Sequence, residues 1–430
     1  MTNLAWNVER VLPSAIADLH RLISIPSISS MPEHDADVAA CADAVSGLFR
    51  DLGASEVKLL DGGGKPAVWA NFPGPEGTPT VLLYAHYDVQ PTGDTDAWTS
   101  PAFEPTERDG RLYARGSADD KGGVALHVAA LRVFDGKPPV GVKVFIEGEE
   151  EVGSPSMPTL LDRYRDELAA DVYVVADSVN WEVGKPSLTT SLRGVADCQV
   201  TVSTLAEGLH SGQFGGVVPD ALTALCRLLA TLHDDAGNVA IEGLVTGTAP
   251  DLDYPEDRLL EETGLLEGVS QIGDGSVVER MWFKPAASVL AIDATPVAKA
   301  SNTLIPSARA KVSVRLVPGQ DPAAAAKALE EHLRRNAPWG AHVDVVAGQC
   351  GAPGRITLEG ERAEAAKTAF REAFGVDAVE IGCGGSIPIV AEFADRNPDA
   401  LVLVTAVTDP NSRMHGIDES LDLGDFAKAA

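Results

Sequence analysis

Cysteine is scarce in this chain of 430 residues, and no two cysteines stand in a CxxC spacing. An odd, dispersed set predicts reduced thiols in a cytoplasm and no disulfide framework. The five are Cys41, Cys198, Cys226, Cys350 and Cys383. The chain also lacks an apolar run of membrane-spanning length, and its first residues lack the basic start and continuous apolar stretch of a signal peptide. We therefore expect a cytoplasmic protein without a membrane partner.

Basic residues are also few. Lys and Arg number 34 against 63 Asp and Glu, which gives a formal net charge of −29. So acidic a surface repels nucleic acid and anionic membranes, and we expect neither as a partner. Any positively charged site must then be local, and metal ions are the simplest way to build one.

The apolar pattern predicts an α/β fold. With 45% apolar and 23% charged residues the chain is typical of a soluble globular protein, and its length predicts two domains. Short apolar runs that alternate with helical patterns indicate a mostly parallel mixed sheet with helices on both faces. The runs are Ala67–Asn71, Val81–Ala85, Val142–Ile146 and Val172–Ala176, and helices are predicted at Gly122–Phe134, Met157–Leu168, Glu361–Phe374 and Ile387–Arg396.

A different texture begins near Leu192. Alternating strands, a helix at Ala221–His233, two further strands, a helix at Pro322–Arg335 and a last strand give the order β-α-β-β-α-β. The acidic connection 235–282 has no predicted structure. We therefore expect a catalytic domain formed by residues 1–191 and 351–430, with an inserted βαββαβ domain at 192–350.

Polar clusters follow the apolar runs, where open α/β sheets bind ligands. They are "HYDVQP" with His86 and Asp88, "RGSADDKGG" with Asp119, "FIEGEEEVGS" with Glu150 and Glu151, "VVADS" with Asp177 and "RMHGIDE" with His415. Each alone has a plainer explanation: a glutamate run is usually a solvated turn, an Asp pair can cap a helix, and a single histidine is more often structural. Together they form the O/N ligand set that suits zinc and its neighbours, because converging carboxylates need cations to stay ionised.

With these motifs in this order, the sequence resembles the dinuclear zinc metallopeptidases that include carnosinase, cytosolic non-specific dipeptidase, carboxypeptidase G, aminoacylase and succinyl-diaminopimelate desuccinylase. The resemblance runs from "LISIPSIS" to "HGIDE" and includes "LHSGQFGG" and "GGSIP". It is strongest to the dipeptidase branch. It implies two divalent metal ions, zinc before manganese or cobalt. Five ligands are implied: His86 and Asp177 on one ion, Glu151 and His415 on the other, and Asp119 bridging both.

The resemblance also implies roles around the ions. Asp88 would hold the ring of His86 by its other nitrogen. Glu150 would be the general base that activates a water bridging the metals. The peptide between Asp119 and Asp120 would be cis. The residues alone leave open that Asp120, and not Asp119, is the bridge.

The inserted lid and dimerisation domain would contribute to the substrate site. His210 would reach the active site of the partner subunit in a homodimer and steady the oxyanion, although it could be only a turn residue. The implied substrate-binding residues are Asn302, Arg315, Gly385 and Ser386. Arg315 suits a bidentate grip on a free carboxylate, but it could also be an exposed sheet residue. Gly382-Cys383 departs from the Arg-Glu usual in dipeptidase relatives.

The predicted function is therefore a metal-dependent dipeptidase that cleaves short unblocked peptides with a free C-terminal carboxylate. An N-acyl-amino-acid amidohydrolase with the same metal chemistry is the nearest alternative. A catalytically silent binding protein and a solute-binding α/β protein are further alternatives. The intact set of acids and histidines argues against the first of these two, and the lack of an export signal argues against the second.

Overall fold

The computed structural model describes residues 4–385 and 387–430, and the chain divides into two compact units. The first contains the residues up to Thr190 together with Ile356–Ile381 and Ile387–Ala430. The second contains Ser191–Arg355 and the short segment that begins at Gly382. In sequence the second unit is thus an insertion into the first. Within the described residues, no helix combines the length and apolar character that crossing a membrane requires.

A six-stranded sheet forms the centre of the first unit, in the order β1-β2-β6-β3-β7-β17. Its strands are β1 (Glu56–Leu60), β2 (Ala67–Phe72), β3 (Thr80–His86), β6 (Gly141–Glu147), β7 (Val172–Val175) and β17 (Leu401–Val404). β6, β3, β7 and β17 run parallel, whereas β1 and β2 form antiparallel pairs at one edge. The mostly parallel mixed sheet predicted from the sequence is confirmed.

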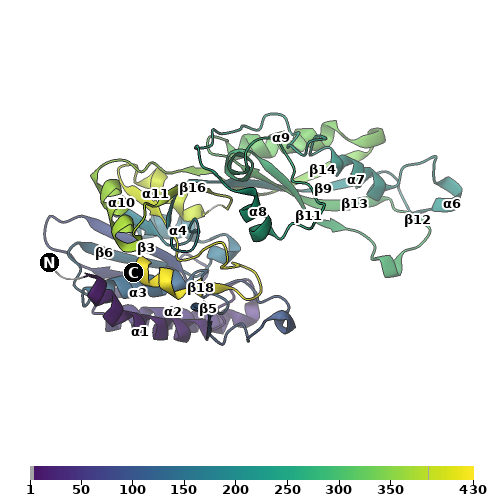
Figure 1. Ribbon diagram of the computed structural model, residues 1–430. Coiled ribbons are helices and arrows are strands. Elements are labelled where there is room, and N and C mark those ends of the chain that lie inside the picture. Colours follow the sequence, from purple (N-terminus) through teal and green to yellow (C-terminus); the bar gives the residue numbers. More distant parts are fainter. Residues whose placement is uncertain (1–3, 386) are drawn as a thin grey trace. The chain divides into compact units, whose positions relative to one another are not determined.

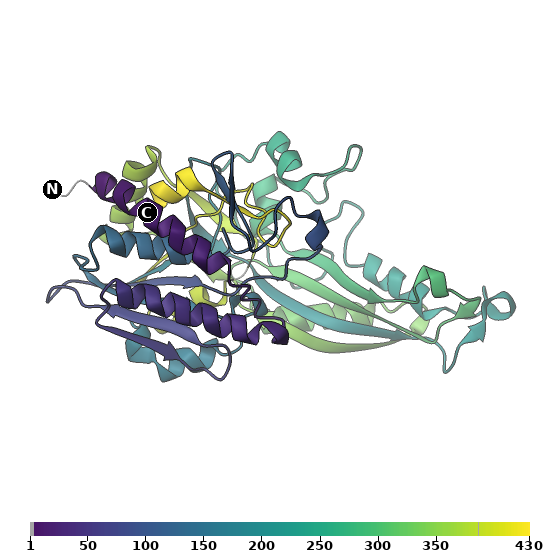
Figure 2. The ribbon, with the colours of Figure 1, turned by 90° about the horizontal axis from the view of Figure 1, so that it is seen from below.

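Helices cover both faces of this sheet (Figure 1). One face carries α1 (Leu4–Ile23), α2 (Asp35–Asp51) and α3 (Lys121–Val133), and the other carries α4 (Met157–Arg163), α5 (Arg165–Leu168), α10 (Glu361–Phe374) and α11 (Pro388–Arg396). Figure 2 shows α1 and α2, in purple, lying across their face. Apolar residues at helical spacing on α2 and α3 are buried against β2, β3 and β6, which explains the position of these helices.

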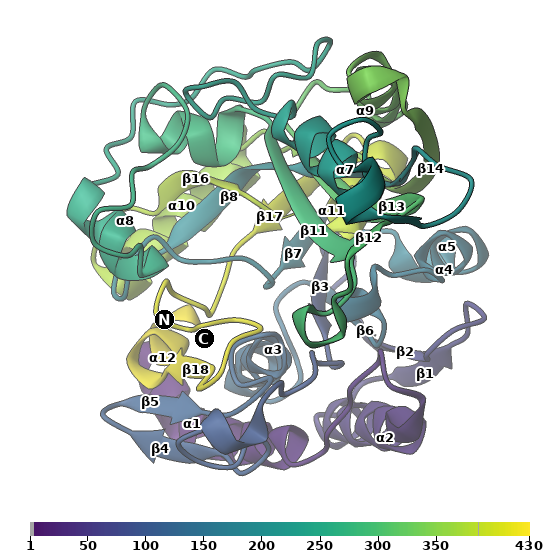
Figure 3. The ribbon, with the colours of Figure 1, turned by 90° about the vertical axis from the view of Figure 1, so that its right-hand side faces the viewer.

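A smaller sheet, β18-β5-β4, lies on the same side as α1 (Figure 3). It consists of β4 (Thr106–Arg108), β5 (Arg111–Tyr113) and β18 (Ser420–Asp422), and α12 (Leu423–Ala429) follows it. β8 (Ser187–Leu192), β15 (Gly354–Arg355) and β16 (Val379–Cys383) form another three-stranded sheet. β18 follows His415 in the sequence and pairs with β5, which shortly precedes Asp119.

The second unit is an antiparallel sheet, β11-β13-β9-β14, packed on two helices. Its elements are β9 (Gly194–Ser203), α7 (Ala221–Ala230), β11 (Ala286–Asp293), β13 (Ser307–Leu316), α9 (Pro322–Arg335) and β14 (His342–Gly351). Their order confirms the predicted β-α-β-β-α-β arrangement. Alternate residues of β13 are buried in the core with the apolar faces of α7 and α9, as expected for a half-covered sheet.

Short elements complete the chain. β10 (Leu209–His210) pairs with β12 (Thr303–Leu304), and α6 (Ser211–Phe214) follows β10. The connection 235–282 contains α8 (Glu256–Thr263) and leads into a π-helical turn, Glu279–Phe283. Single 3-10 turns lie at Pro32–His34, Thr95–Ala97, Glu150–Val152, Val297–Lys299 and Pro338–Gly340.

Candidate metal centre

The predicted ligands of the first unit lie on loops that follow its parallel strands. His86 is the last residue of β3, Asp177 comes just after β7, and Glu151 lies in the turn after β6. Asp119 precedes α3, and His415 lies on the loop between β17 and β18. Parallel strands bring their carboxyl ends to one edge, so residues far apart in sequence meet there.

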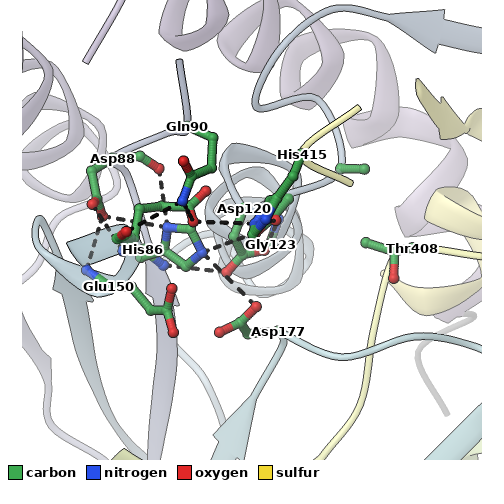
Figure 4. Close-up of polar contacts among 12 residues, drawn as sticks. His86, Asp88, Gln90, Asp120, Gly123, Glu150, Asp177, Thr408 and His415 are labelled. Atoms are coloured by element: carbon green, nitrogen blue, oxygen red, sulfur yellow. Dashed lines mark hydrogen bonds and ion pairs between the residues drawn. The ribbon is translucent and has the colours of Figure 1, made fainter. Parts of the chain in front are cut away.

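Two groups of potential ligand atoms result, and within each group the atoms all lie within 4.8 Å of one another. The first group is His86, Asp120 and Asp177, and the second is Asp119, Glu151 and His415. Figure 4 shows His86, Asp177 and His415 converging on one region. Every ligand predicted from the sequence therefore lies in one of the two groups.

Asp119 stands between the two groups. One of its carboxylate oxygens is 3.1 Å from Nε2 of His86, and the other is 3.0 Å from Nε2 of His415. The same His415 nitrogen is 3.2 Å from Oε2 of Glu151, and Nε2 of His86 is 3.8 Å from Oδ1 of Asp177. A carboxylate that offers one oxygen to each side has the geometry of a bridging ligand.

Both carboxylate oxygens of Asp120 accept hydrogen bonds from the main chain. Oδ1 accepts the backbone N–H of Gly123 at 3.1 Å and so caps α3, while Oδ2 accepts the backbone N–H of His86 at 3.2 Å. The geometry therefore favours Asp119 over Asp120 as the bridge, and the helix-cap explanation of the Asp pair applies to Asp120. The peptide bond between Asp119 and Asp120 is cis, as the resemblance implies.

Asp88 contacts the other ring nitrogen of His86, as predicted, and it does so with its main chain as well as its side chain. Nδ1 of His86 is 3.0 Å from the backbone carbonyl oxygen of Asp88, and the Asp88 carboxylate is farther away, at 3.4 Å. That carboxylate accepts the backbone N–H groups of Glu150 and Glu151, at 3.3 and 3.2 Å. Asp88 thus orients the His86 ring mainly through its main chain and fixes the Glu150–Glu151 turn with its side chain.

The electrostatics of the site call for positive charge. Burial and the nearby carboxylates of Glu151 and Asp119 raise the pKa of Glu150 to about 7, although His86 opposes the shift. Hydrogen bonds to Asp119 and Glu151 raise the pKa of His415 to about 10. Burial, with the charge of Glu150, also raises the pKa of Asp177 well above its usual value. In the absence of a cation, the site would instead take up protons.

The donor set fits divalent metal ions. Each group offers one imidazole nitrogen and carboxylate oxygens, which are ligands that zinc, manganese and cobalt accept. Two divalent ions would supply the positive charge that otherwise comes from protonated side chains. The arrangement can therefore hold two ions, one on each side of Asp119.

The residues predicted in the second unit form two separate clusters. His210 on β10 pairs with Thr303 on β12, and the Asn302 carbonyl accepts the N–H of Ser211 at 2.9 Å. Nδ1 of His210 accepts the N–H of Gly212 at 3.1 Å, so the histidine also caps α6. His210 and Asn302 are therefore neighbours, and both are exposed.

The other cluster surrounds Arg315 near the end of β13. Arg315 pairs with Val195 of β9, and Arg193, just before that strand, donates its backbone N–H to the carbonyl of Cys383 at 3.1 Å. The segment that leads to Gly385 thus lies beside the same part of the sheet as Arg315. Ser386 lies outside the described residues.

Three supporting residues were missed in the sequence, although they stand within the quoted motifs. Gln90 donates from its side-chain amide to Oε2 of Glu151 at 2.8 Å, and Arg115 pairs with Glu419. The i, i+2 spacing of His86, Asp88 and Gln90 is a signal for Gln90, because it continues the alternation of β3. No local signal connects Arg115 with Glu419, which is 304 residues away.

The α/β sheet and the paired imidazole and carboxylate groups are those of a metallohydrolase with candidate ligands for two ions. The family described as Peptidase family M20/M25/M40 matches residues 82–430, and the chain belongs to this family. Its members use a divalent metal, and the chain is an enzyme of the dipeptidase branch.

Individual relatives of the chain are also named as dipeptidases. The chain is 36% identical to cysteinylglycine-S-conjugate dipeptidase of Corynebacterium striatum, over 98% of this chain and 93% of the relative. It is 29% identical to β-Ala-His dipeptidase of Rattus norvegicus, over 89% and 83%. Among solved structures, the dipeptidase Dug1p of Saccharomyces cerevisiae superimposes with a TM-score of 0.86 at 25% identity, covering 99% of this chain and 95% of that one.

Proposed function

We propose that the chain hydrolyses unblocked dipeptides with two divalent ions, zinc first among them, held by the two groups of the first unit. The position of Asp119 between His86 and His415 carries the proposal, since it offers one oxygen to each ion. The relatives are named for dipeptides, which supports the same substrate class here. Bound ions would supply Lewis acidity for the attacking water and the scissile carbonyl.

Glu150 would move the proton. Its carboxyl group takes a proton from the attacking water and passes it to the nitrogen of the leaving amine. The hydrogen bond between the Glu150 N–H and Asp88 fixes the backbone from which this side chain projects.

Arg315 would bind the substrate's C-terminal carboxylate. In the part of the chain that the structure describes, the guanidinium of Arg315 has no acidic partner. Burial lowers the pKa of Arg193, and the nearby positive charge of Arg315 lowers it further. Two neighbouring guanidinium groups favour an anion between them. Asn302, Gly385 and Ser386 stay predictions as further substrate contacts.

A homodimer explains how His210 could also take part. Arg315 pairs with Val195 at one end of the sheet, and Ser307 pairs with Ser203 at the other, beyond which β12 and His210 follow. Eight residues of strand span roughly 26 Å, whereas an extended dipeptide spans about 7 Å. One copy of the second unit therefore cannot place both residues on one dipeptide, and we propose that the partner subunit supplies His210.

His210 has the right chemistry for the oxyanion. Because its Nδ1 accepts the N–H of Gly212, the neutral ring carries its proton on Nε2, which becomes a donor. A cytoplasmic location also stays a prediction. It is supported by the five cysteines, none of which forms a disulfide bond within the described residues.

A substrate panel tests the proposal. Cys-Gly, β-Ala-His and other dipeptides would be assayed beside their N-acetylated and C-amidated forms, with zinc, manganese or cobalt returned to metal-stripped protein. We expect cleavage of the free dipeptides and a loss on the order of 10²-fold or more with the C-amides, because amidation leaves the half-buried guanidinium of Arg315 without its partner. Faster cleavage of the N-acetylated forms would identify an acyl-amino-acid amidohydrolase. No turnover with any metal would support a silent binding protein.

A further inference from the structure

A buried ion pair lies next to the metal centre without touching the ligand side chains. Nη1 of Arg115 is 2.6 Å from Oε2 of Glu419, and both side chains are almost completely buried. A buried ion pair is a poor source of stability, because desolvation cancels much of its attraction. The role of the pair is therefore better inferred from the hydrogen bonds that it makes with the main chain.

Glu419 holds the backbone at the bridging ligand. Its Oε1 accepts the N–H groups of Ala118 and Asp119, at 3.0 and 3.1 Å. These two bonds fix the peptide units from which the Asp119 carboxylate projects. Its Oε2 is used by Arg115, so both oxygens of Glu419 have partners.

Arg115 ties two further loops to the same point. Its Nη2 donates to the carbonyl oxygens of Gly416, at 3.1 Å, and Pro91, at 3.2 Å. Gly416 follows His415, and Pro91 follows Gln90, whose amide holds the Glu151 carboxylate at 2.8 Å. Every member of the Asp119–Glu151–His415 group is thus linked to the ion pair within a few bonds.

The other group is built differently. His86 ends β3, Asp177 follows β7, and Asp120 caps α3, so each is positioned by regular secondary structure. No hydrogen bond between described residues joins this group to Arg115 or Glu419. By contrast, residues 405–419 contain neither strand nor helix, and His415 itself has φ of 63°. This loop depends on outside contacts for its conformation.

We propose that Arg115 and Glu419 are positioning residues for one of the two ions, the one bound by Asp119, Glu151 and His415. Loss of the pair weakens chiefly that ion, because all three of its ligands depend on the pair, whereas the ion at His86 and Asp177 shares only Asp119 with it and is weakened less. The inference rests on the proposed two-ion function.

The test is a metal titration of Glu419→Gln. Glutamine keeps the length of the side chain and can still accept from Ala118 and Asp119, but its amide N–H groups would face the Arg115 guanidinium. Metal-stripped wild type and variant would be titrated with Zn²⁺ by calorimetry and with Co²⁺ by visible absorption. We expect two ions in wild type. In the variant we expect unequal losses: one ion that loses little affinity, and a second that binds about 10- to 100-fold more weakly.

Two milder variants and a control accompany it. Arg115→Lys keeps the charge but cannot reach both carbonyl oxygens, and Gln90→Ala cuts only the link to Glu151. Both should weaken the same ion, and excess metal should restore kcat with KM unchanged. Leu19→Ala, which opens a cavity in the core cluster between α1 and α3, should lower the melting temperature and leave both affinities intact.

The outcomes separate the two proposals. If wild type binds fewer than two ions, the proposed function fails. If wild type binds two and the variants lose both affinities equally, or lose neither, the positioning role is overturned. Should Glu419→Gln fail to fold, Arg115→Lys and Gln90→Ala decide the question by the same criterion.

Discussion

A buried histidine on α3 gives the fold a specific weakness toward acid. Nε2 of His127 is 2.8 Å from the backbone carbonyl oxygen of Tyr84 on β3, and the side chain is buried. Burial lowers its pKa from 6.5 to about 4, although the hydrogen bond opposes the shift. The folded protein therefore keeps a neutral ring whose N–H donates to Tyr84, at a point where α3 packs against β3.

The sign and size of the effect follow from linkage. In the unfolded chain His127 takes up a proton near pH 6.5, whereas in the folded chain it does so only near pH 4. The contribution of His127 to the free energy of unfolding is complete above pH 6.5 and is lost as the pH falls from 6.5 to about 4. The free energy of unfolding should drop by about 2 kcal/mol at pH 5 and about 3 kcal/mol at pH 4 from this residue alone.

The comparison of wild type with His127→Gln isolates this term. Glutamine can donate to the Tyr84 carbonyl but does not titrate, and all other groups cancel in the difference. Urea unfolding of metal-stripped protein would be followed between pH 7 and pH 4.5 by hydrogen exchange of the α3 peptide, so that only unfolding of the first unit is counted. We expect wild type to lose stability relative to the variant as the pH falls.

A pH-independent difference between the two proteins would refute this reasoning. It would mean that His127 is already charged in the folded protein, or that the ring is reached by water. A constant offset added to a difference that still changes with pH would only measure how well glutamine fills the space, and it does not bear on the prediction.

Four further predictions concern the site. Glu150→Gln should retain two metal ions by elemental analysis yet lose kcat by about 10²- to 10⁴-fold, and near-normal turnover would remove Glu150 as the base. His415→Ala should bind fewer ions than wild type, and full occupancy would show that His415 is no ligand. Arg315→Met should lower kcat/KM for a free dipeptide on the order of 10²-fold and have little effect on its C-amide. The same change at Arg309, on the same face of β13, should leave kcat/KM nearly unchanged for both substrates. Equal losses in the two variants would contradict the role assigned to Arg315. Co-expressed His210→Ala and Glu150→Ala subunits should recover about a quarter of wild-type activity, since half the dimers are mixed and each has one whole site. Confirmed mixed dimers without recovery would place His210 outside the partner's site.

The sequence predicted well those helices whose ends carry chemical signals. α9 and α10 begin and end at the predicted residues. Asp321 caps α9 ahead of a proline at its first position, and Gly375 ends α10 with φ of 76°. The helix predicted at Met157–Leu168 is instead broken at Tyr164, whose hydroxyl accepts the N–H of Asp61 from a distant loop. β1 was missed, because it is an edge strand with a weak alternation that pairs only with β2.

The sequence by itself determined the chemical inventory of this protein. Apolar runs and their periods are local, so the strand ends and the acids and histidines that follow them could be identified without a structure. Only the tertiary structure decided which atoms meet. It set Asp119 between two histidines and turned Asp120 into a helix cap, although the two are adjacent in sequence. It also joined Arg115 to Glu419 across 304 residues, because loop conformations and side-chain directions are fixed by long-range contacts that leave no period in the chain.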